Sequence, residues 1–430
     1  MQRLATANAD FEQRFRAILE DGRDTTTRVD AAVAAIIAEV RAEGDAALLR
    51  LTARHDGWAP ADTTALRVTT AEMDAAVATV APALMQALNL AALRIEAFHR
   101  AQLPADLVLP GADGIALGLR WNALDAVGLY VPGGKAAYPS SVLMNAIPAR
   151  VAGVARLAMV VPTPRGVLNP LVLAAARRAG VTEIWRIGGA QAVAALAWGT
   201  ASLAPVDRVV GPGNAYVAEA KRQVFGRVGI DSIAGPSEVL ILADAANDPA
   251  HVAMDLLAQA EHDEAAQAIL ITDDVAFADA VTREVTAALA TLPRRAIAGE
   301  SWDRHGAVIL VRDWAEAVML TNRLAPEHLQ IMTADPQAIF ARIRHAGAAF
   351  LGRHTPEAIG DYVAGPNHVL PTGRTSRFAS GLSVFDFLKR TTWVEADAAG
   401  LAAIGPAAVQ LAEAEGLGAH AASVALRLAP

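Results

Sequence analysis

The stretch LLAQAEHDEAAQA, residues 256–268, carries side chains that could hold a metal ion. Gln259 and His262 are three positions apart, so on a helix they share one face. Imidazole nitrogen is a common zinc ligand, whereas a side-chain amide is a rare one. Because Glu261, Asp263 and Glu264 surround the pair, a solvated helix surface is the simpler explanation of these residues alone. The choice depends on the rest of the chain.

A second pair of residues could transfer protons. Glu327 and His328 stand in LAPEH, residues 324–328, between a predicted helix and the predicted strand LQIMT, and Pro326 stiffens the connection. A carboxylate beside an imidazole offers two titrating groups for proton transfer near neutral pH. An ordinary polar surface loop explains this pair equally well.

Two further segments present polar residues in constrained settings. GDYVAGPNHVLPT, residues 360–372, holds Asp361, Asn367 and His368 in a loop that its prolines stiffen, which favours positioned side chains. EGLGAH, residues 415–420, separates Glu415 and His420 by a glycine-containing turn. Those two residues could face one site, or both could face water.

The absence of cysteine limits the chemistry of the whole chain. None of the 430 residues is cysteine, which excludes disulfides, thiolate metal ligands and a cysteine nucleophile. Any zinc must therefore be held by imidazole, carboxylate or amide groups, and any aldehyde oxidation must proceed without a thiohemiacetal. The formal charge of −8, with both signs interspersed, argues against nucleic acid or an anionic membrane as the main partner.

The sequence predicts a soluble cytoplasmic protein. The N-terminal residues MQRLATANADFEQRF include acidic side chains and no apolar core segment, unlike a signal peptide. The longest uncharged run, residues 187–206, is interrupted by glycines and a proline. It predicts a buried helix followed by a loop, and no membrane span.

Strand–turn–helix units recur along the chain. After a mostly helical stretch to about residue 105, the apolar segments LDAVGLY, ARLAMVV, EIWRI and VDRVV each precede a turn and a helix. A second set contains SEVLILAD, QAILITDD, AVILVRD, HLQIMTA and AGAAFLG. Such repetition predicts parallel sheets covered by helices. We expect two α/β domains with helical extensions at both ends.

Glycine-rich turns follow several of these strands. GPGNAY, residues 211–216, is the nearest match to the dinucleotide fingerprint, although tyrosine replaces its third glycine. VPGGKAAYPSS (131–141) and IGGAQA (187–192) are similar turns. Each could be only a tight strand–helix turn, but backbone amides at helix starts suit a pyrophosphate. Together they favour a nucleotide in the crevice beyond the carboxyl ends of the strands.

Six segments, in their order and spacing, resemble the histidinol dehydrogenase family across nearly the full chain. They are GPGNAYV, GPSEVLI, QAEHDE, APEHL, GDYVAGPNHVLPT and EGLGAH. The resemblance implies a zinc-dependent enzyme of histidine biosynthesis, which oxidises L-histidinol through L-histidinal to L-histidine and reduces two NAD. It also implies a homodimer in which the C-terminal residues complete the neighbour's site, a point that the sequence itself leaves open.

The resemblance also implies a role for individual residues. The implied zinc ligands are Gln259, His262, Asp361 and His420, and the implied acid/base pair is Glu327 and His328. The implied NAD contacts are Tyr130, Gln191 and Asn214. The implied substrate contacts are Ser237, Gln259, His262, His328, Asp361, Glu415 and His420. The family's zinc holds nitrogens of the substrate, so it orients the substrate and does not activate water.

These observations lead to an expected division of the chain into two incomplete Rossmann-like parallel-sheet domains and two extensions. Residues 1–26 are expected to form an N-terminal helical arm. Residues 27–129 and 238–382 are expected to form the first α/β domain, with the zinc and acid/base residues. Residues 130–237 are expected to form the second, NAD-binding domain, and residues 383–430 a helical dimerisation tail.

Three other functions were weighed against this one. A relative of the same fold could oxidise another amino alcohol or hydroxy acid, but Glu415 and His420 match the histidinol-binding pattern. A binding protein without activity would be expected to lack Glu327 or His328, and both are present. Zinc hydrolysis is disfavoured because the sequence contains no H-E-x-x-H segment.

Overall fold

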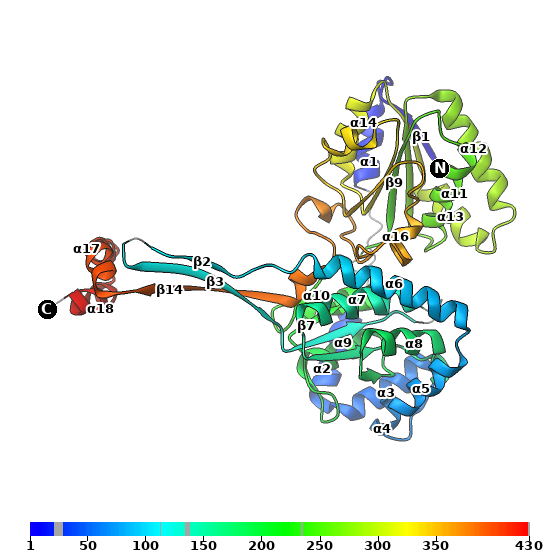
Figure 1. Ribbon diagram of the computed structural model, residues 1–430. Coiled ribbons are helices and arrows are strands. Elements are labelled where there is room, and N and C mark those ends of the chain that lie inside the picture. The colour runs from blue at the N-terminus through cyan, green and yellow to red at the C-terminus, as the bar shows by residue number, and fades with distance from the viewer. Residues whose placement is uncertain (21–28, 112, 134–137, 234, 429–430) are drawn as a thin grey trace.

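The computed structural model describes residues 1–20, 29–111, 113–133, 138–233 and 235–428. These residues form two α/β lobes, each built on a parallel sheet, and a long arm that extends away from both lobes (Figure 1). One sheet has five strands and the other has six. The expected α/β class with two parallel sheets is confirmed.

The five-stranded lobe has the strand order β6-β5-β4-β7-β8. Its strands are β4 (Ala126–Tyr130), β5 (Arg156–Val160), β6 (Glu183–Trp185), β7 (Arg208–Val210) and β8 (Gly229–Ile230). Its crossover helices are α7 (Pro139–Ala152), η2 (Pro164–Gly166), α8 (Pro170–Ala179), α9 (Gly189–Trp198) and α10 (Ala215–Val224). Helices cover both faces of the sheet, which explains why β4 and β5 are apolar along almost their whole length.

Helices from the N-terminal third also pack on this lobe. They are α2 (Asp30–Glu43), α3 (Asp45–Asp56), α4 (Thr63–Leu66), α5 (Thr70–Thr79) and α6 (Pro82–Arg100). Val33, Ile37 and Val40 form one apolar face of α2, which packs against α9, while α5 and α6 pack against α8 and α7. The expectation that residues 27–129 join residues 238–382 therefore differs from the structure, because the apolar faces of these helices are buried on the five-stranded lobe.

The six-stranded lobe has the strand order β1-β11-β10-β9-β12-β13. Its strands are β1 (Gln2–Ala5), β9 (Glu238–Ala243), β10 (Gln267–Thr272), β11 (Ala307–Leu310), β12 (His328–Met332) and β13 (Ala348–Leu351). Its helices are α1 (Phe11–Leu19), α11 (Pro249–Ala260), α12 (Val275–Leu289), α13 (Arg295–His305), α14 (Trp314–Leu324), α15 (Pro336–Phe340) and α16 (Ala358–Tyr362). Apart from β1, the strands repeat the order of the other sheet, with the first strand of each set in the middle.

The N-terminus belongs to this six-stranded lobe. Strand β1 pairs in parallel with β11, and α1 buries Phe11, Phe15 and Ile18 in the same apolar cluster as Leu4. The described part of residues 1–26 is thus an edge strand and a covering helix, in place of the expected helical arm. Residues 21–26 lie outside the described part of the chain.

The arm is an antiparallel sheet with two helices at its far end (Figure 1). Its elements are β2 (Leu107–Leu109), β3 (Ile115–Ala123), β14 (Leu388–Ala396), α17 (Ala398–Ala414) and α18 (Gly418–Leu428), after the short turns η3 (Thr375–Arg377) and η4 (Val384–Phe387). β14 pairs with β3 along its whole length, from Leu388 opposite Ala123 to Ala396 opposite Ile115. The tail expected to be helical from residue 383 therefore begins with η4 and a strand.

The segment after α16 joins the two lobes. Asn367 donates its side-chain amide to the Met144 carbonyl of α7 at 2.6 Å. Arg94 of α6 donates to the carbonyl oxygens of Val363 and Ala364 at 2.7 and 3.1 Å. These bonds fix the end of α16 against the five-stranded lobe.

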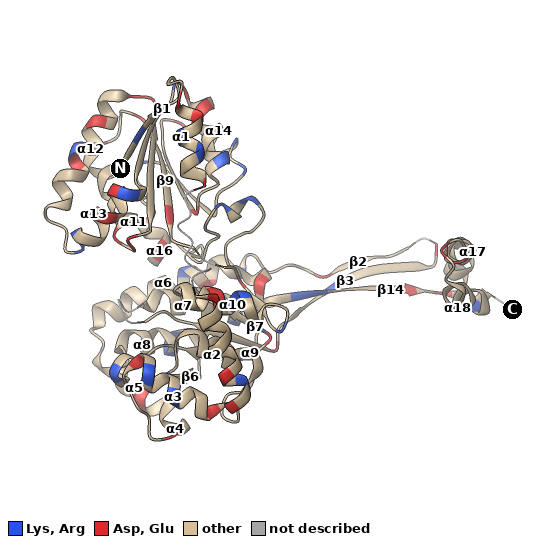
Figure 2. Cartoon of the chain, turned by 180° about the vertical axis from the view of Figure 1, so that it is seen from behind, with Lys and Arg blue, Asp and Glu red and all other residues tan. Residues whose placement is uncertain are grey.

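Charged residues of both signs are scattered over the helices of both lobes (Figure 2). Across the described ranges, no single helix has the length and hydropathy to cross a membrane. α5 and α6 meet that test only when taken together, and a bend of 115° separates them.

Candidate active site

The candidate metal and acid/base residues gather at the amino edge of the six-stranded sheet. Gln259 lies in the last turn of α11 and His262 follows that helix, while Glu327 immediately precedes β12 and His328 is its first residue. A crossover helix runs opposite to its strands, so the end of α11 lies where the next strand begins. The nucleotide is expected beyond the carboxyl ends of strands, whereas these four residues lie at an amino edge.

His328 is buried, and its ring is oriented by the main chain. Its Nδ1 lies 3.0 Å from the Glu238 carbonyl oxygen, which can only accept, so Nδ1 carries the proton. Its Nε2 is buried and has no hydrogen-bond partner among the described residues. Burial lowers the pKa of the imidazole, which favours the neutral ring at neutral pH. The geometry therefore presents Nε2 as a proton acceptor.

Two buried carboxyl groups flank this imidazole. Glu327 accepts a hydrogen bond from the Glu238 N–H at 2.8 Å through its Oε2, and that atom lies 3.6 Å from His328 Nδ1. Burial raises the pKa of the Glu327 carboxyl well above its ordinary value. Glu357 lies on the other side, with Oε1 3.7 Å from His328 Nε2. Burial, and then the charges of Asp361 and Asp255, raise the pKa of Glu357 to about 8.

The donor atoms around this imidazole suit a cation. One ligand atom each from His328, Glu357 and Asp361 lies within 4.8 Å of the others. His262 is half exposed, and its Nε2 is 3.9 Å from Asp361 Oδ2. Both polar atoms of the buried Gln259 amide have no hydrogen-bond partner within the described ranges, which is costly unless a ligand satisfies them. These nitrogen and oxygen donors fit a divalent ion such as zinc.

Glu357 is the site residue that sequence reasoning missed. It stands four positions before Asp361, so the two residues share one face of the short helix α16. That spacing is the signal that could have identified it, since no motif surrounds it. In contrast, Gln259, His262 and Asp361 were all expected here, although the expected fourth ligand lies elsewhere.

His368 links this site to the five-stranded lobe. Its Nδ1 donates to the Asp361 carbonyl oxygen at 3.0 Å, and its Nε2 lies 3.3 Å from the Ser141 hydroxyl in the first turn of α7. Burial lowers the pKa of this imidazole as well. Asp361 is thereby positioned relative to both lobes.

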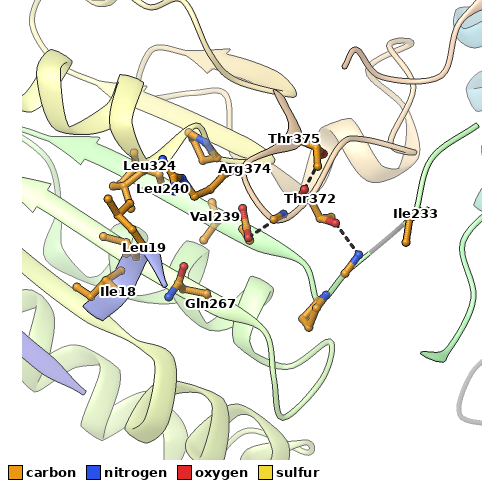
Figure 3. A pocket seen from close by; sticks show the side chains of 16 residues that line it. Ile18, Leu19, Ile233, Val239, Leu240, Gln267, Leu324, Thr372, Arg374 and Thr375 are labelled. Carbon is orange, nitrogen blue, oxygen red and sulfur yellow. Dashed lines mark hydrogen bonds between the residues drawn. The ribbon is translucent and has the colours of Figure 1, made fainter. Parts of the chain in front are cut away.

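Ser237 directly precedes β9, beside a cavity of about 340 Å³ that Figure 3 shows. Glu238, Gln267, Thr372 and Arg374 are polar residues that line the cavity, and Thr372 accepts a hydrogen bond from the Gly235 N–H at 2.6 Å. The remaining lining is largely apolar and comes from α1, β9, β10, the end of α14 and the neighbouring loops. The main chain of Glu238, one of the lining residues, is hydrogen-bonded to the side chains of both Glu327 and His328.

The candidate dinucleotide contacts lie together at the carboxyl edge of the five-stranded sheet. Tyr130 ends β4, Gln191 is in the first turn of α9, and Asn214 is the N-cap of α10. The Tyr130 hydroxyl accepts a hydrogen bond from the Gly189 N–H at 3.0 Å, and burial raises the pKa of the phenol to about 12. Residues 134–137 of the turn after β4 lie outside the described part of the chain.

Glu415 and His420 are not near the other candidates within one chain. Glu415 is the C-cap of α17 and His420 is in the first turn of α18, so both sit at the far end of the arm (Figure 1). Both side chains are exposed there. One chain alone thus leaves the expected set of ligands incomplete.

Comparison with known proteins gives consistent matches along the chain. The family model described as histidinol dehydrogenase matches residues 19–428. Histidinol dehydrogenase of Gluconobacter oxydans is 63% identical over 429 residues, covering 100% of this chain and 99% of that relative. The enzyme of Rhodospirillum rubrum is 62% identical over 427 residues, covering 99% and 98%. A crystal structure of histidinol dehydrogenase from Elizabethkingia anophelis has a TM-score of 0.93 at 34% identity, covering 100% and 98%.

We predict that Gly360→Ala damages the site through packing. A Cβ atom at Gly360 would lie 2.5 Å from the Phe350 ring, and that ring contacts His328 with 6.1 Å between centroids. Overpacking of this kind typically costs about 1–3 kcal/mol, and the ring can relieve it only by moving against His328. Thermal unfolding should record the loss of stability, with a parallel fall in activity.

Gly299→Ala in α13 is the matched control for that variant. A Cβ at Gly299 meets nothing within 4 Å, so alanine should stabilise the helix by roughly 0.5–1 kcal/mol and leave activity unchanged. Equal behaviour of the two variants would refute the packing argument.

Proposed function

The chain belongs to the histidinol dehydrogenase family, and on that premise we propose that it is a zinc-dependent dehydrogenase that uses NAD. It would oxidise L-histidinol to L-histidinal and then to L-histidine, reducing two NAD in turn, as the last step of histidine biosynthesis. We also propose that it works in the cytoplasm, in line with its mixed charge pattern.

One observation carries this proposal. His328 is buried, with Nδ1 bound to the Glu238 carbonyl and Nε2 turned toward the carboxyl of Glu357, and burial lowers the pKa of its imidazole, which favours the neutral ring. An imidazole in that state can accept one proton from an alcohol at neutral pH. Glu327 beside it is a second group for a second proton, as two successive oxidations require.

The proposed zinc ligands are Gln259, His262 and Asp361, with His420 as the fourth. When bound, zinc would act as a Lewis acid that orients the imidazole and amino nitrogens of histidinol. The ligand set is supported by the buried polar atoms of the Gln259 amide and by the cysteine-free composition. Glu357 adds a carboxylate close to the same atoms and would help to balance the charge of the ion.

In the alcohol step, we propose that His328 Nε2 takes the hydroxyl proton. Bound NAD would supply the oxidising power by accepting the hydrogen on carbon as hydride, so that the alcohol would lose two electrons and two hydrogens and become the aldehyde. NAD would lie at Tyr130, Gln191 and Asn214, where the strands lead into turns at the starts of α9 and α10. The contact between His368 and Ser141 supports the placement of the amino edge of the six-stranded sheet near the carboxyl edge of the five-stranded sheet, because Ser141 lies in the first turn of α7, the helix after β4.

In the aldehyde step, we propose that Glu327 activates water. The chain has no cysteine to form a thiohemiacetal, so water must add to the aldehyde before a second hydride can leave. Glu327 would take the proton of the attacking water, and the hydrate would then give up hydride to a second NAD and form the acid. Positive charge in the loaded site would lower the pKa of this buried carboxyl toward the working range. Ser237 and Glu415 are proposed as further substrate contacts.

We propose that the protein works as a homodimer with shared sites. Support comes from the arm, which holds the exposed Glu415 and His420 far from His262 in one chain (Figure 1). The arm also exposes large apolar side chains, which in an isolated chain would face water. Those side chains include Val108, Leu117, Val394, Ile404 and Leu411.

The division of labour between the two proton acceptors is testable. Each histidinol should yield two NADH. His328→Ala should slow alcohol oxidation more than aldehyde oxidation, whereas Glu327→Gln should chiefly slow the aldehyde step, each by on the order of 10²–10⁴. Glu300→Gln on the surface of α13 is the control for the amide substitution and should leave both steps unchanged. Equal effects of both active-site variants on both steps would contradict the assignment.

The shared site can be tested by exchanging subunits between two inactive variants, His262→Ala and His420→Ala. In a mixed dimer with shared sites, one site collects both defects and the other collects neither. Random pairing makes half of the dimers mixed, so about a quarter of wild-type activity should return.

A mass-tagged subunit would confirm that exchange has occurred, and His354→Ala, at an exposed position, would serve as the fully active control. If each chain builds its own site, every site keeps one defect and no activity returns.

A further inference from the structure

A buried ion pair lies beneath the turn that follows β7. Lys221 of α10 and Asp231, which follows β8, form a salt bridge, and their side chains are only 2% and 4% exposed. Moving charges out of water is expensive, so a buried pair is weak evidence for a contribution to stability. We therefore look to the position of the pair in the fold, and not to stability, to explain why two charges are buried there.

Both members of the pair bind the same residue, Gly211. The Gly211 N–H donates to Asp231 Oδ2 at 2.7 Å, and Lys221 Nζ donates to the Gly211 carbonyl oxygen at 3.0 Å. Hydrogen bonds to charged partners are stronger than neutral ones, and burial keeps water from competing for them. Both main-chain polar groups of Gly211 are thus hydrogen-bonded to members of the ion pair, the N–H to Asp231 and the carbonyl to Lys221.

Gly211 occupies a position that no other residue fits. Its φ is +112°, and a Cβ there would lie 2.1 Å from the carbonyl oxygen of Tyr130. The turn G-P-G-N therefore rests directly on the end of β4. Loss of the hydrogen bonds from Lys221 and Asp231 to Gly211 would allow this turn to move relative to Tyr130.

Tyr130 extends the same network to the third turn. Its hydroxyl accepts from the Gly189 N–H at 3.0 Å, at the start of α9, two residues before Gln191. The turn after β7, the end of β4 and the start of α9 are therefore connected through buried hydrogen bonds. These are the three places where Asn214, Tyr130 and Gln191 stand.

We propose that Lys221 and Asp231 are positioning residues for the dinucleotide, holding the turn at residues 211–214 in its NAD-binding conformation before NAD arrives. This inference rests on the proposed function of the five-stranded lobe as the NAD-binding lobe. Neither residue needs to touch NAD. Their effect is to remove the cost of ordering the turn when NAD binds, which raises affinity without a new contact.

The test compares NAD affinity with substrate affinity. The single variants Lys221→Met and Asp231→Asn each leave one buried charge without its partner, which can unfold the chain. The main variant is therefore the double one, Lys221→Met/Asp231→Asn, which removes both charges. Its Kd and KM for NAD should rise roughly tenfold or more, while kcat at saturating NAD and the KM for histidinol stay within about twofold of wild type.

The control is a second ion pair of the same sheet at its opposite edge. Arg156 is the first residue of β5 and Glu183 the first of β6, and two hydrogen bonds of 2.8 and 2.9 Å join their side chains. Arg156 also donates to the main-chain carbonyl groups of Ala204 and Pro205. Arg156→Met/Glu183→Gln should lower the melting temperature but leave the Kd for NAD unchanged. Hydrogen exchange supplies a second measurement, since the Gly211 amide of the wild type should be protected before NAD is added.

Two results would overturn the positioning role. One is a Kd for NAD in the Lys221→Met/Asp231→Asn variant that equals that of wild type or of the control variant. The other is a Gly211 amide in the wild type that gains protection only when NAD binds. A wild-type protein that bound no NAD would instead contradict the proposed function itself, so the two failures are distinguishable.

Discussion

The docking of residues 361–368 across the two lobes is the constraint on which the rest of the site depends. Asn367 donates a hydrogen bond to the Met144 carbonyl, and Arg94 donates to the carbonyl groups of Val363 and Ala364. His368 contacts the Asp361 carbonyl with one ring nitrogen and the Ser141 hydroxyl with the other. These contacts join the amino edge of one parallel sheet to the lobe whose carboxyl edge carries the glycine-rich turns. The candidate metal ligand Asp361 and the candidate cofactor edge are thereby fixed relative to each other.

The two edges contribute different chemistry because they are built differently. At the carboxyl edge, helix starts offer main-chain amides, which suit the phosphates of a dinucleotide. At the amino edge, the end of α11 and the start of β12 offer side chains, and burial shifts the pKa of Glu327 upward and that of His328 downward. Both shifts favour neutral groups, so neither side chain has to be an isolated buried charge.

The sequence predicts the parallel sheets well because strand–turn–helix units leave a strong local signal. It is less informative wherever an element has few buried residues. β1 buries only Leu4, and β14 is exposed along most of its length, so neither resembles a core strand. The run of β-branched residues at Thr391, Thr392 and Val394 is the signal that could have identified β14.

Long-range packing is the other feature that sequence reasoning could not supply. The apolar faces of α2, α5 and α6 are evident from spacing, but nothing local indicates which sheet they cover. The same limit applies to Glu357, whose contact with His328 joins residues far apart in the chain. The polar groups at Gln259, His262, Asp361 and Glu327 stand out locally, but a solvated surface explains them as well, so their roles were expected only from the family resemblance.

We propose that one complete site combines the amino edge of the six-stranded sheet in one chain with the arm of another. Crystals of the protein grown with zinc and histidinol, measured by anomalous scattering at the zinc edge, test it most directly. We expect one zinc peak per site, bound by Gln259, His262 and Asp361 of one subunit and by His420 of the partner subunit. A peak bound by His420 of the same chain, or one remote from these residues, would contradict it.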